Sequence, residues 1–247
     1  MSRPGVDLVW HPHGATDLVL LAHGGMEYSD ANPHLWRGAI LRLWPFAEAI
    51  RAVVPAVAIG LMRYRYRGWN GDAADSAADL RAVLDELPPV IQRVVLIGHS
   101  MGGRAVVAAG DHPRVAGVLA LAPWLPDGEP LAALRAPVTF AHGTLDTITD
   151  PRATTAYANR LRATGTPVTV YSVAAETHTL LHRPTDWNTL VATFTASVLG
   201  AAPAGSTPRA DTEPLPQYGP RSSIPAAVWS IAVARLRLPV VERFQVG

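Results

Sequence analysis

Short apolar runs alternate with helical patterns along most of the chain, and this alternation limits the folds that are open to it. A short apolar run between turn residues is typical of a strand buried on both faces, and intervening helices connect such strands in parallel. The candidate strands are Asp17–Ala22, Ala56–Leu61, Arg93–Ile97, Val115–Leu121, Pro137–Ala141 and Pro167–Val173. The pattern predicts an α/β domain with a mostly parallel central sheet and helices on both faces.

Three longer segments between these runs carry apolar residues at helical spacing. They cover about Trp44–Val54, Asp72–Leu87 and Thr185–Leu199. Pro45 suits the first turn of the first helix, Asp72 is the expected N-cap of the second, and Gly200 is expected to stop the third.

Composition narrows the classes of function that the chain can have. It has 247 residues, of which 49% are hydrophobic and 17% charged, and this fits one large buried core. The formal net charge of +1 gives no reason to expect a nucleic-acid partner, and the lack of cysteine and lysine excludes thiol and lysine chemistry. Because no apolar run reaches the length of a membrane span and no signal-peptide pattern is present, we expect a cytoplasmic protein.

Prolines divide the chain into two parts. Residues 1–200 are expected to form one domain, and Ala201–Ser223, with five prolines among small and polar residues, is typical of a linker. Ile224–Val241 is apolar again. This tail can dock on the domain, pair with a second copy of the chain to form a homo-oligomer, or stay disordered, and the sequence leaves the three alternatives open.

A serine lies in a glycine turn between a strand and a helix. The strand candidate that ends at Ile97 runs directly into Gly98-His99-Ser100-Met101-Gly102, and a helix-compatible segment follows. At such a turn the serine backbone is strained, its hydroxyl stands above the sheet, and flanking glycines relieve the crowding. This context predicts Ser100 as a nucleophile, with His99 packing or hydrogen-bonding inside the turn.

A second glycine turn, His23-Gly24-Gly25-Met26, follows the strand candidate Asp17–Ala22. Glycines let the backbone approach a bound carbonyl group closely. Because an oxyanion is stabilised by N–H groups placed where its charge develops, the backbone N–H groups of Gly25 and Met101 are candidates for an oxyanion hole.

The two glycine turns and two later loops occur in the order of the α/β-hydrolase fold family, which the chain resembles from about Asp17 to Gly200. It looks most similar to compact bacterial members of the esterase, lipase and dienelactone-hydrolase type. The resemblance implies an α/β-hydrolase fold with shortened N-terminal strands, because few residues precede Asp17. It also implies a minimal lid, since only Trp124–Ala136 is available where many members insert one, and this argues against interfacial lipase activity.

The family order of catalytic residues is serine, acid, histidine, with the acid in a loop after a strand. Asp146, in Gly143-Thr144-Leu145-Asp146, matches the acid position of the family. Asp150, just before Pro151, is the second candidate for the acid and the expected cap of the following helix. His142 precedes the loop and is expected to be structural.

His178 holds the family position of the base, in the loop between the last strand and the last helix. There its imidazole would take the proton of Ser100 while Asp146 fixes the tautomer of the ring. His182, nearer the helix, is the competing candidate.

Arg63, Arg65 and Arg67 alternate with Tyr64 and Tyr66. They can form a basic rim that recognises an anionic substrate, or a solvated arginine face above packed aromatic rings. We favour the second interpretation.

Other histidines and tryptophans give weaker indications. His11 and His13 lack a third ligand, so no metal site is predicted. Three tryptophans can line an acyl pocket or belong to the core, namely Trp36, Trp44 and Trp124.

Together these features predict a serine hydrolase that cleaves a carboxylic ester or thioester of a small or medium-sized molecule through an acyl-serine intermediate, without a cofactor. Lyase, peroxidase-like or acyl-transfer chemistry on the same scaffold is an alternative, and a non-catalytic binding protein is another. The expected partner is a small-molecule substrate.

Overall fold

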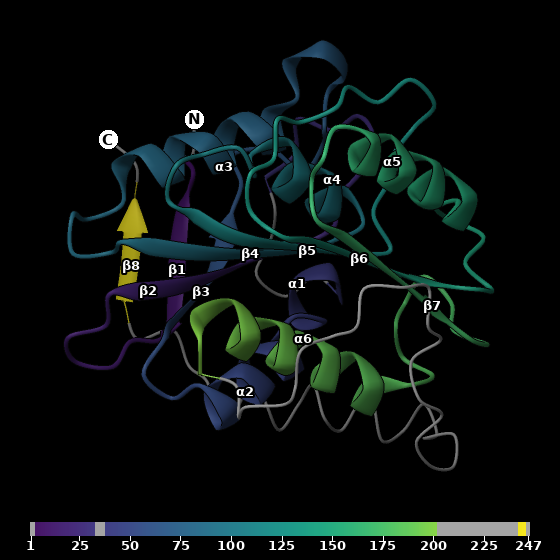
Figure 1. Cartoon of the computed structure of the whole chain (residues 1–247). Helices are drawn as coiled ribbons and strands as arrows, with labels where there is room; N and C mark the ends of the chain where they lie inside the picture. The colour runs from purple at the N-terminus through teal and green to yellow at the C-terminus, as the bar shows by residue number, and fades with distance from the viewer. Residues whose placement is uncertain (1–2, 33–37, 202–241, 246–247) are drawn as a thin grey trace.

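The computed structural model describes residues 3–32, 38–201 and 242–245. Within these residues the strands form one sheet in the order β7-β6-β5-β4-β2-β3-β1-β8 (Figure 1). The strands are β1 (Gly5–Trp10), β2 (Asp17–Ala22), β3 (Ala58–Arg63), β4 (Arg93–His99), β5 (Val115–Leu121), β6 (Val138–Gly143), β7 (Val168–Val173) and β8 (Glu242–Gln245). The helices are α1 (Gly38–Leu41), α2 (Trp44–Val53), α3 (Asp75–Glu86), α4 (Met101–Ala108), α5 (Pro151–Ala163) and α6 (Pro184–Leu199).

The sheet is mostly parallel, as the sequence predicts. Strands β3, β2, β4, β5, β6 and β7 pair in parallel, whereas β1 pairs with β3 and β8 pairs with β1 in antiparallel fashion. Strand β1, which the sequence pattern does not predict, is the one leading antiparallel strand in the described residues. The fold is the α/β-hydrolase fold with a shortened N-terminal part.

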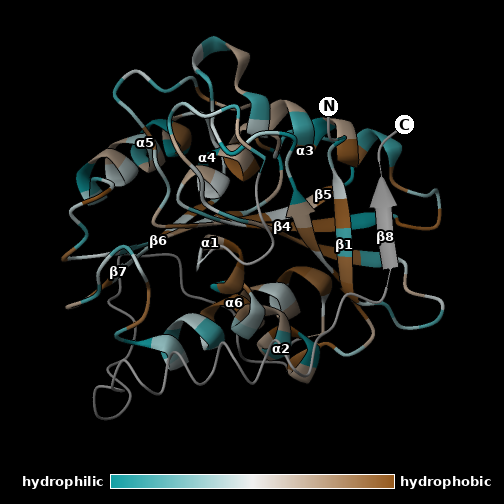
Figure 2. Ribbon diagram, turned by 180° about the vertical axis from the view of Figure 1, so that it is seen from behind, coloured by the Kyte–Doolittle hydropathy of each residue, from teal (hydrophilic) through white to brown (hydrophobic). Residues whose placement is uncertain are grey.

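Each face of the sheet carries its own hydrophobic core. Alternate residues of β4 point to opposite faces, with Val94 and Leu96 in one core and Val95 and Ile97 in the other. Helices α3, α4 and α5 cover the first face, and α1, α2 and α6 cover the second (Figure 1). Figure 2 shows the hydrophobic strands between the two helical layers. This double burial explains the continuous apolar runs of the strands.

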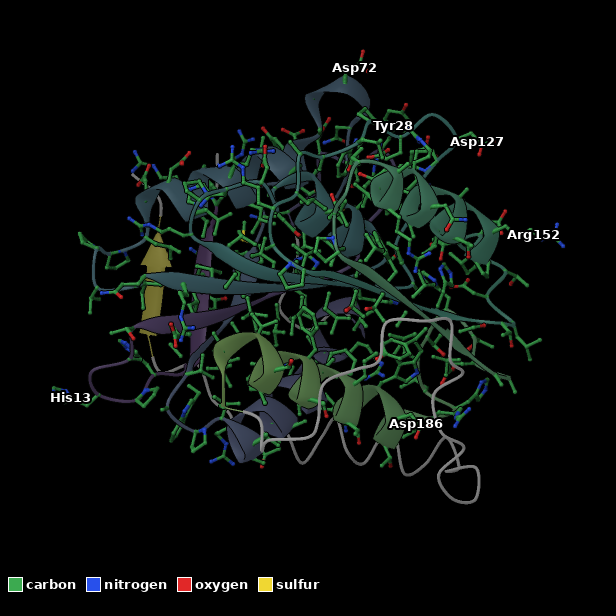
Figure 3. All side chains as sticks on the ribbon, in the orientation of Figure 1. His13, Tyr28, Asp72, Asp127, Arg152 and Asp186 are labelled. Atoms are coloured by element: carbon green, nitrogen blue, oxygen red, sulfur yellow. The ribbon has the colours of Figure 1, made fainter. Side chains whose placement is uncertain are left out.

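The predicted helices are present with small shifts, but one predicted cap is wrong. Asp72 lies in a 3₁₀ turn, Gly71–Ala73, and α3 begins at Asp75 without a side-chain cap. Figure 3 shows Asp72 pointing away from the domain. Contacts from elsewhere in the fold set the start of the helix, because Asp75 accepts hydrogen bonds from Arg65 (3.1 Å) and Asn70 (2.9 Å).

The connection between β5 and β6 affects access to the carboxyl ends of the strands. Residues 122–137, between β5 and β6, contain no helix, in agreement with a minimal lid.

Strand β8 places the described end of the chain at the sheet edge beside β1. Ala202–Val241, with most of the predicted linker and the apolar segment Ile224–Val241, lies outside the described residues. In the described ranges, no helix combines the length and the apolar character needed to cross a membrane.

Candidate active site

Ser100 lies at the tip of the turn between β4 and α4. Its backbone has φ 58° and ψ −121°, a strained conformation for a residue with a side chain. The Ser100 N–H donates to the carbonyl of Leu121 (3.0 Å), which ties the turn to the end of β5. A Cβ atom at Gly98 would collide with the backbone of Gly102, so this tight turn requires glycine.

The structure brings Ser100, His178 and Asp146 together from three separate loops. The Ser100 Oγ atom lies 3.0 Å from His178 Nε2, and His178 Nδ1 lies 2.8 Å from Asp146 Oδ2. Because a carboxylate only accepts, Nδ1 carries the proton in the neutral ring and Nε2 is left to accept the serine proton. The competing histidine, His182, lies instead against Glu176, 3.5 Å away.

Asp146 is held by several donors at once. Its Oδ1 atom accepts from the N–H groups of Ile148 (2.8 Å) and Thr149 (3.0 Å). Its Oδ2 atom accepts from the Thr149 hydroxyl (2.9 Å), from His178 and from His142 Nε2 (3.1 Å). Burial raises the pKa of the Asp146 carboxyl, but the hydrogen bonds from Thr149 and His178 outweigh it, so the pKa is lowered. The carboxylate therefore stays ionised.

His142 contacts this carboxylate, although the sequence only suggested that it is structural. Its Nδ1 atom lies 2.9 Å from the Thr154 hydroxyl of α5, which fixes the ring with Nε2 protonated and directed at Asp146. Burial lowers the pKa of His142, against the opposing effect of Asp146. The ring is thus a neutral donor.

The second candidate for the acid, Asp150, caps α5 as predicted, accepting from the Arg152 N–H at 2.8 Å.

Glu176 organises the loop that carries His178. This fully buried side chain accepts hydrogen bonds from the backbone N–H groups of Thr177 (2.8 Å) and Arg183 (2.8 Å) and from the indole of Trp187 (3.0 Å). Glu176 is not among the sequence-predicted residues, because its donors become neighbours only when the loop folds around it.

Two further side chains, Arg42 and His99, hold the same loop through hydrogen bonds to its backbone carbonyls. Arg42 donates to the carbonyls of Thr179 (2.9 Å) and Leu180, and burial lowers its pKa to about 10. His99 donates from Nε2 to the carbonyl of His178 (2.9 Å), and the two rings lie 4.8 Å apart at 37°. Burial lowers the pKa of His99 to about 3, so the ring is neutral beneath the candidate base. This agrees with the packing and hydrogen-bonding role expected for His99.

The glycine turn after β2 runs beside the candidate nucleophile. A Cβ atom at Gly24 would lie 3.2 Å from Ser100 Cβ and 3.7 Å from its Oγ. A Cβ atom at Gly25 would collide with the carbonyl oxygen of Arg67 and the side chain of Met101. The Met26 N–H is occupied by the Arg67 carbonyl (3.0 Å). Met101 begins α4, where the first N–H groups have no partner inside the helix.

The three tryptophans have different surroundings. The backbone N–H of Trp124 donates to the Ser100 carbonyl (3.1 Å), and its ring packs edge-on against Trp69. The guanidinium of Arg104 lies over both rings. Trp44 is buried in the core between the sheet and α6, and Trp36 lies outside the described residues.

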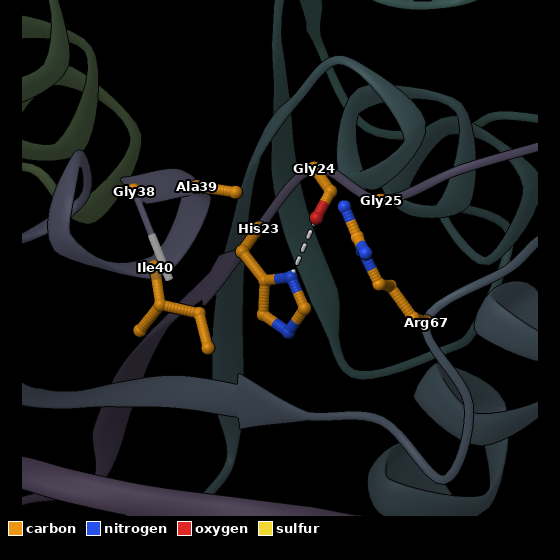
Figure 4. A pocket seen from close by; sticks show the side chains of 7 residues that line it. All are labelled: His23, Gly24, Gly25, Gly38, Ala39, Ile40 and Arg67. Carbon is orange, nitrogen blue, oxygen red and sulfur yellow. Dashed lines mark hydrogen bonds between the residues drawn. The ribbon is translucent and has the colours of Figure 1, made fainter. Parts of the chain in front are cut away.

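A cavity of about 270 Å³ adjoins the glycine turn (Figure 4). It is lined by His23, Gly24, Gly25, Gly38, Ala39, Ile40 and Arg67. Burial lowers the pKa of His23 to about 4, so this ring is neutral. Among the described residues, no group of three or more histidine, aspartate or glutamate side chains could hold a metal ion.

Comparison with solved structures shows the same fold in several proteins. Est1E from Butyrivibrio proteoclasticus is 14% identical, with a TM-score of 0.57 over 80% of this chain and 94% of Est1E. A serine hydrolase without a lid from Xanthomonas campestris is 19% identical, with a TM-score of 0.59 over 81% and 90%. An esterase from Pyrococcus furiosus is 16% identical, with a TM-score of 0.58 over 77% and 85%.

Sequence comparison gives the relationship itself. No curated protein sequence matches the chain. The sequence profile of the alpha/beta hydrolase family, however, matches residues 19–237. Since this match spans most of the chain, the protein belongs to the alpha/beta hydrolase family.

Proposed function

We propose that this protein is a serine hydrolase that cleaves a carboxylic ester or thioester of a small or medium-sized molecule. The observation that carries the proposal is the chain of contacts from Ser100 Oγ to His178 Nε2 (3.0 Å) and from His178 Nδ1 to Asp146 Oδ2 (2.8 Å). A serine hydroxyl becomes a useful nucleophile only when a correctly oriented base takes its proton, and these contacts supply that base.

Acylation begins when His178 removes the proton of Ser100 and Oγ attacks the acyl carbon. The carbonyl electron pair moves onto oxygen, where the N–H groups of Gly25 and Met101 stabilise the negative charge by about 3 kcal/mol for each donor, as in comparable sites. The intermediate collapses as the imidazolium of His178 protonates the departing alcohol or thiol. An acyl ester of Ser100 remains.

Deacylation repeats these steps with water. His178 removes a proton from the water molecule, the hydroxide adds to the acyl carbon, and the same N–H groups stabilise the oxyanion. His178 then returns the proton to Ser100 Oγ as the acid product leaves. Ionised Asp146 stabilises the imidazolium in both halves of the reaction, and no cofactor is needed.

A panel of 4-nitrophenyl esters of graded acyl length tests this function. Ser100→Ala should lower kcat by at least about 10⁴-fold, because the residues of such a triad act as a unit. The variant should also lose covalent labelling by a fluorophosphonate and keep the circular dichroism spectrum of the native protein. Ser172→Ala, at an exposed position of β7, is the matched control and should change none of these properties. Native turnover or labelling in Ser100→Ala would show that another residue is the nucleophile.

A further inference from the structure

Three arginines alternate in the segment that follows β3, and their surroundings differ. Arg63 pairs with the buried Asp7 (2.6 Å), and Arg65 pairs with Asp79 and with Asp75 (3.1 Å). These two pairs, with the buried Tyr64 ring between them, belong to the framework of the fold. In the described part of the chain, no carboxylate forms an ion pair with Arg67. This guanidinium is therefore available for a ligand.

The backbone of Arg67 is fixed against the glycine turn beside Ser100. Its N–H donates to the carbonyl of Ala31 (2.8 Å), and its carbonyl accepts from Met26 (3.0 Å). Its side chain lines the cavity of about 270 Å³, where it extends alongside Gly24 and Gly25 in Figure 4. The main chain thus fixes the point beside the candidate oxyanion hole from which this side chain extends.

Among the described residues of the cavity lining, only Arg67 carries a charge. The glycines, Ala39 and Ile40 are apolar, and His23 is neutral because burial lowers its pKa to about 4. Gly24 borders both the cavity and Ser100, since a Cβ atom there would lie 3.7 Å from Ser100 Oγ. A substrate whose reacting carbonyl lies at Ser100 can therefore extend into the cavity towards the guanidinium of Arg67.

We propose that Arg67 binds a carboxylate group of the substrate, so that the preferred esters carry a second, free carboxylate a few bonds from the scissile ester. This inference rests on the function proposed above and adds the substrate class. A guanidinium matches the planar carboxylate with two parallel N–H donors. A phosphate monoester, with nearly two negative charges at neutral pH, fits a single cation less well.

Paired substrates test this inference. The 4-nitrophenyl half-ester of adipic acid is compared with its uncharged carboxamide analogue, and the acetate ester of 3-hydroxybenzoate with that of 3-hydroxybenzamide. The first pair places the carboxylate on the acyl side and the second on the leaving-group side. The native protein should prefer the anion of at least one pair by about tenfold in kcat/KM, as expected for a charge-assisted contact. Added salt should reduce the preference.

Variants separate Arg67 from the general charge of the protein. Arg67→Leu should reduce the ratio of kcat/KM for the anion to that for its uncharged analogue to about one, and Arg67→Lys should restore part of this preference. Arg152→Leu is the control, because Arg152 is exposed and points away from the domain in Figure 3. An unchanged ratio in Arg67→Leu for both pairs would overturn the inference.

The outcome distinguishes this inference from the proposed function. Turnover of the uncharged esters that depends on Ser100, with a ratio insensitive to Arg67, would refute the carboxylate site alone. If no ester is turned over, the proposed function fails. Calorimetric titration of the Ser100→Ala protein with adipate then decides the carboxylate site by itself, since binding should weaken about tenfold when Arg67→Leu is added. Equal binding in both proteins would refute it.

Discussion

Asp146 is shared by two histidines that differ in their roles. His178 reaches Ser100, whereas His142 points away from it and ends at Thr154. Both donate to the same oxygen, Asp146 Oδ2, at 2.8 and 3.1 Å. A donor that remains neutral stabilises the carboxylate. The carboxylate then stabilises a positive charge on the other ring less strongly. In the proposed mechanism His142 would thereby be a positioning residue that also tunes the candidate base.

Replacing His142 tests this tuning at the scale of one residue. His142→Leu removes the donor, so kcat/KM should fall by about tenfold, the loss typical of a hydrogen bond to a charged group. The less stabilised carboxylate should favour the imidazolium of His178 more strongly. The acid limb of the pH profile of kcat/KM should then move to higher pH. Measuring kcat/KM of ester hydrolysis between pH 5 and 9 tests this.

The conservative variant is the control for this experiment. In His142→Gln the amide nitrogen can take the place of Nε2, so both kcat/KM and the acid limb should return towards native values. A purely structural role for His142 would lower activity in both variants without moving the acid limb, and that result would contradict the interpretation.

The residues of the candidate site could be predicted unequally from the sequence. Ser100, Asp146 and His178 stand in motifs with fixed places relative to strands, so local patterns select them. Their roles remain predictions. His142 and Thr149 lie only four and three residues from Asp146, but their contacts with its carboxylate depend on how the loop between β6 and α5 folds, and no motif assigns them a role.

The turn between β4 and α4 is the element on which the geometry of the site depends. A Cβ atom at Gly102 would meet the carbonyl group of Ala22 and the carbonyl oxygen of His23, all of them backbone atoms. Backbone cannot rotate away as the end of a side chain can. The helix therefore approaches β2 this closely only with glycine at this position.

Gly102→Ala should accordingly destabilise the fold and displace Ser100. Overpacking of this kind costs about 2 to 3 kcal/mol in the free energy of unfolding, which urea denaturation measures. The rate of fluorophosphonate labelling should fall as well. Gly38→Ala is the control, because no atom of the described residues lies within 4 Å of its added Cβ, and its effect should stay below about 1 kcal/mol. Native stability of Gly102→Ala would show that the turn can relax.

Elements with strong local signals were predicted almost to the residue, and those set by distant contacts were not. Strands β2 and β5 match the prediction, and α6 ends at Gly200 as expected. Strand β1 was missed, because it is defined by its antiparallel pairing with the distant strands β3 and β8. The start of α3 was missed for a similar reason, since Arg65 and Asn70 hold Asp75 there.

Two uncharged histidines, His23 and His99, are buried close to the candidate site and affect the stability of the whole molecule. His23 and His99 are 2% and 6% exposed, and burial lowers their pKa values to about 4 and about 3. In the unfolded chain both would titrate near pH 6.5. The unfolded state therefore binds more protons than the folded state over the range from pH 6.5 down to these values.

The sign of the pH dependence follows from this difference. The stability that each neutral histidine contributes is complete above pH 6.5 and is lost as the pH falls towards 4 for His23 and 3 for His99. Between pH 8 and pH 5 each ring should cost about 2 kcal/mol of unfolding free energy. Guanidinium denaturation at pH 8, 7, 6 and 5 measures the loss.

His99→Gln keeps a donor for the His178 carbonyl but cannot titrate, so its loss of unfolding free energy between pH 8 and pH 5 should be smaller by about 2 kcal/mol. His13→Gln, at an exposed position, should behave like the native protein. An identical acid loss in native protein and His99→Gln would mean that His99 is not the neutral, buried ring that links the nucleophile turn to the base loop.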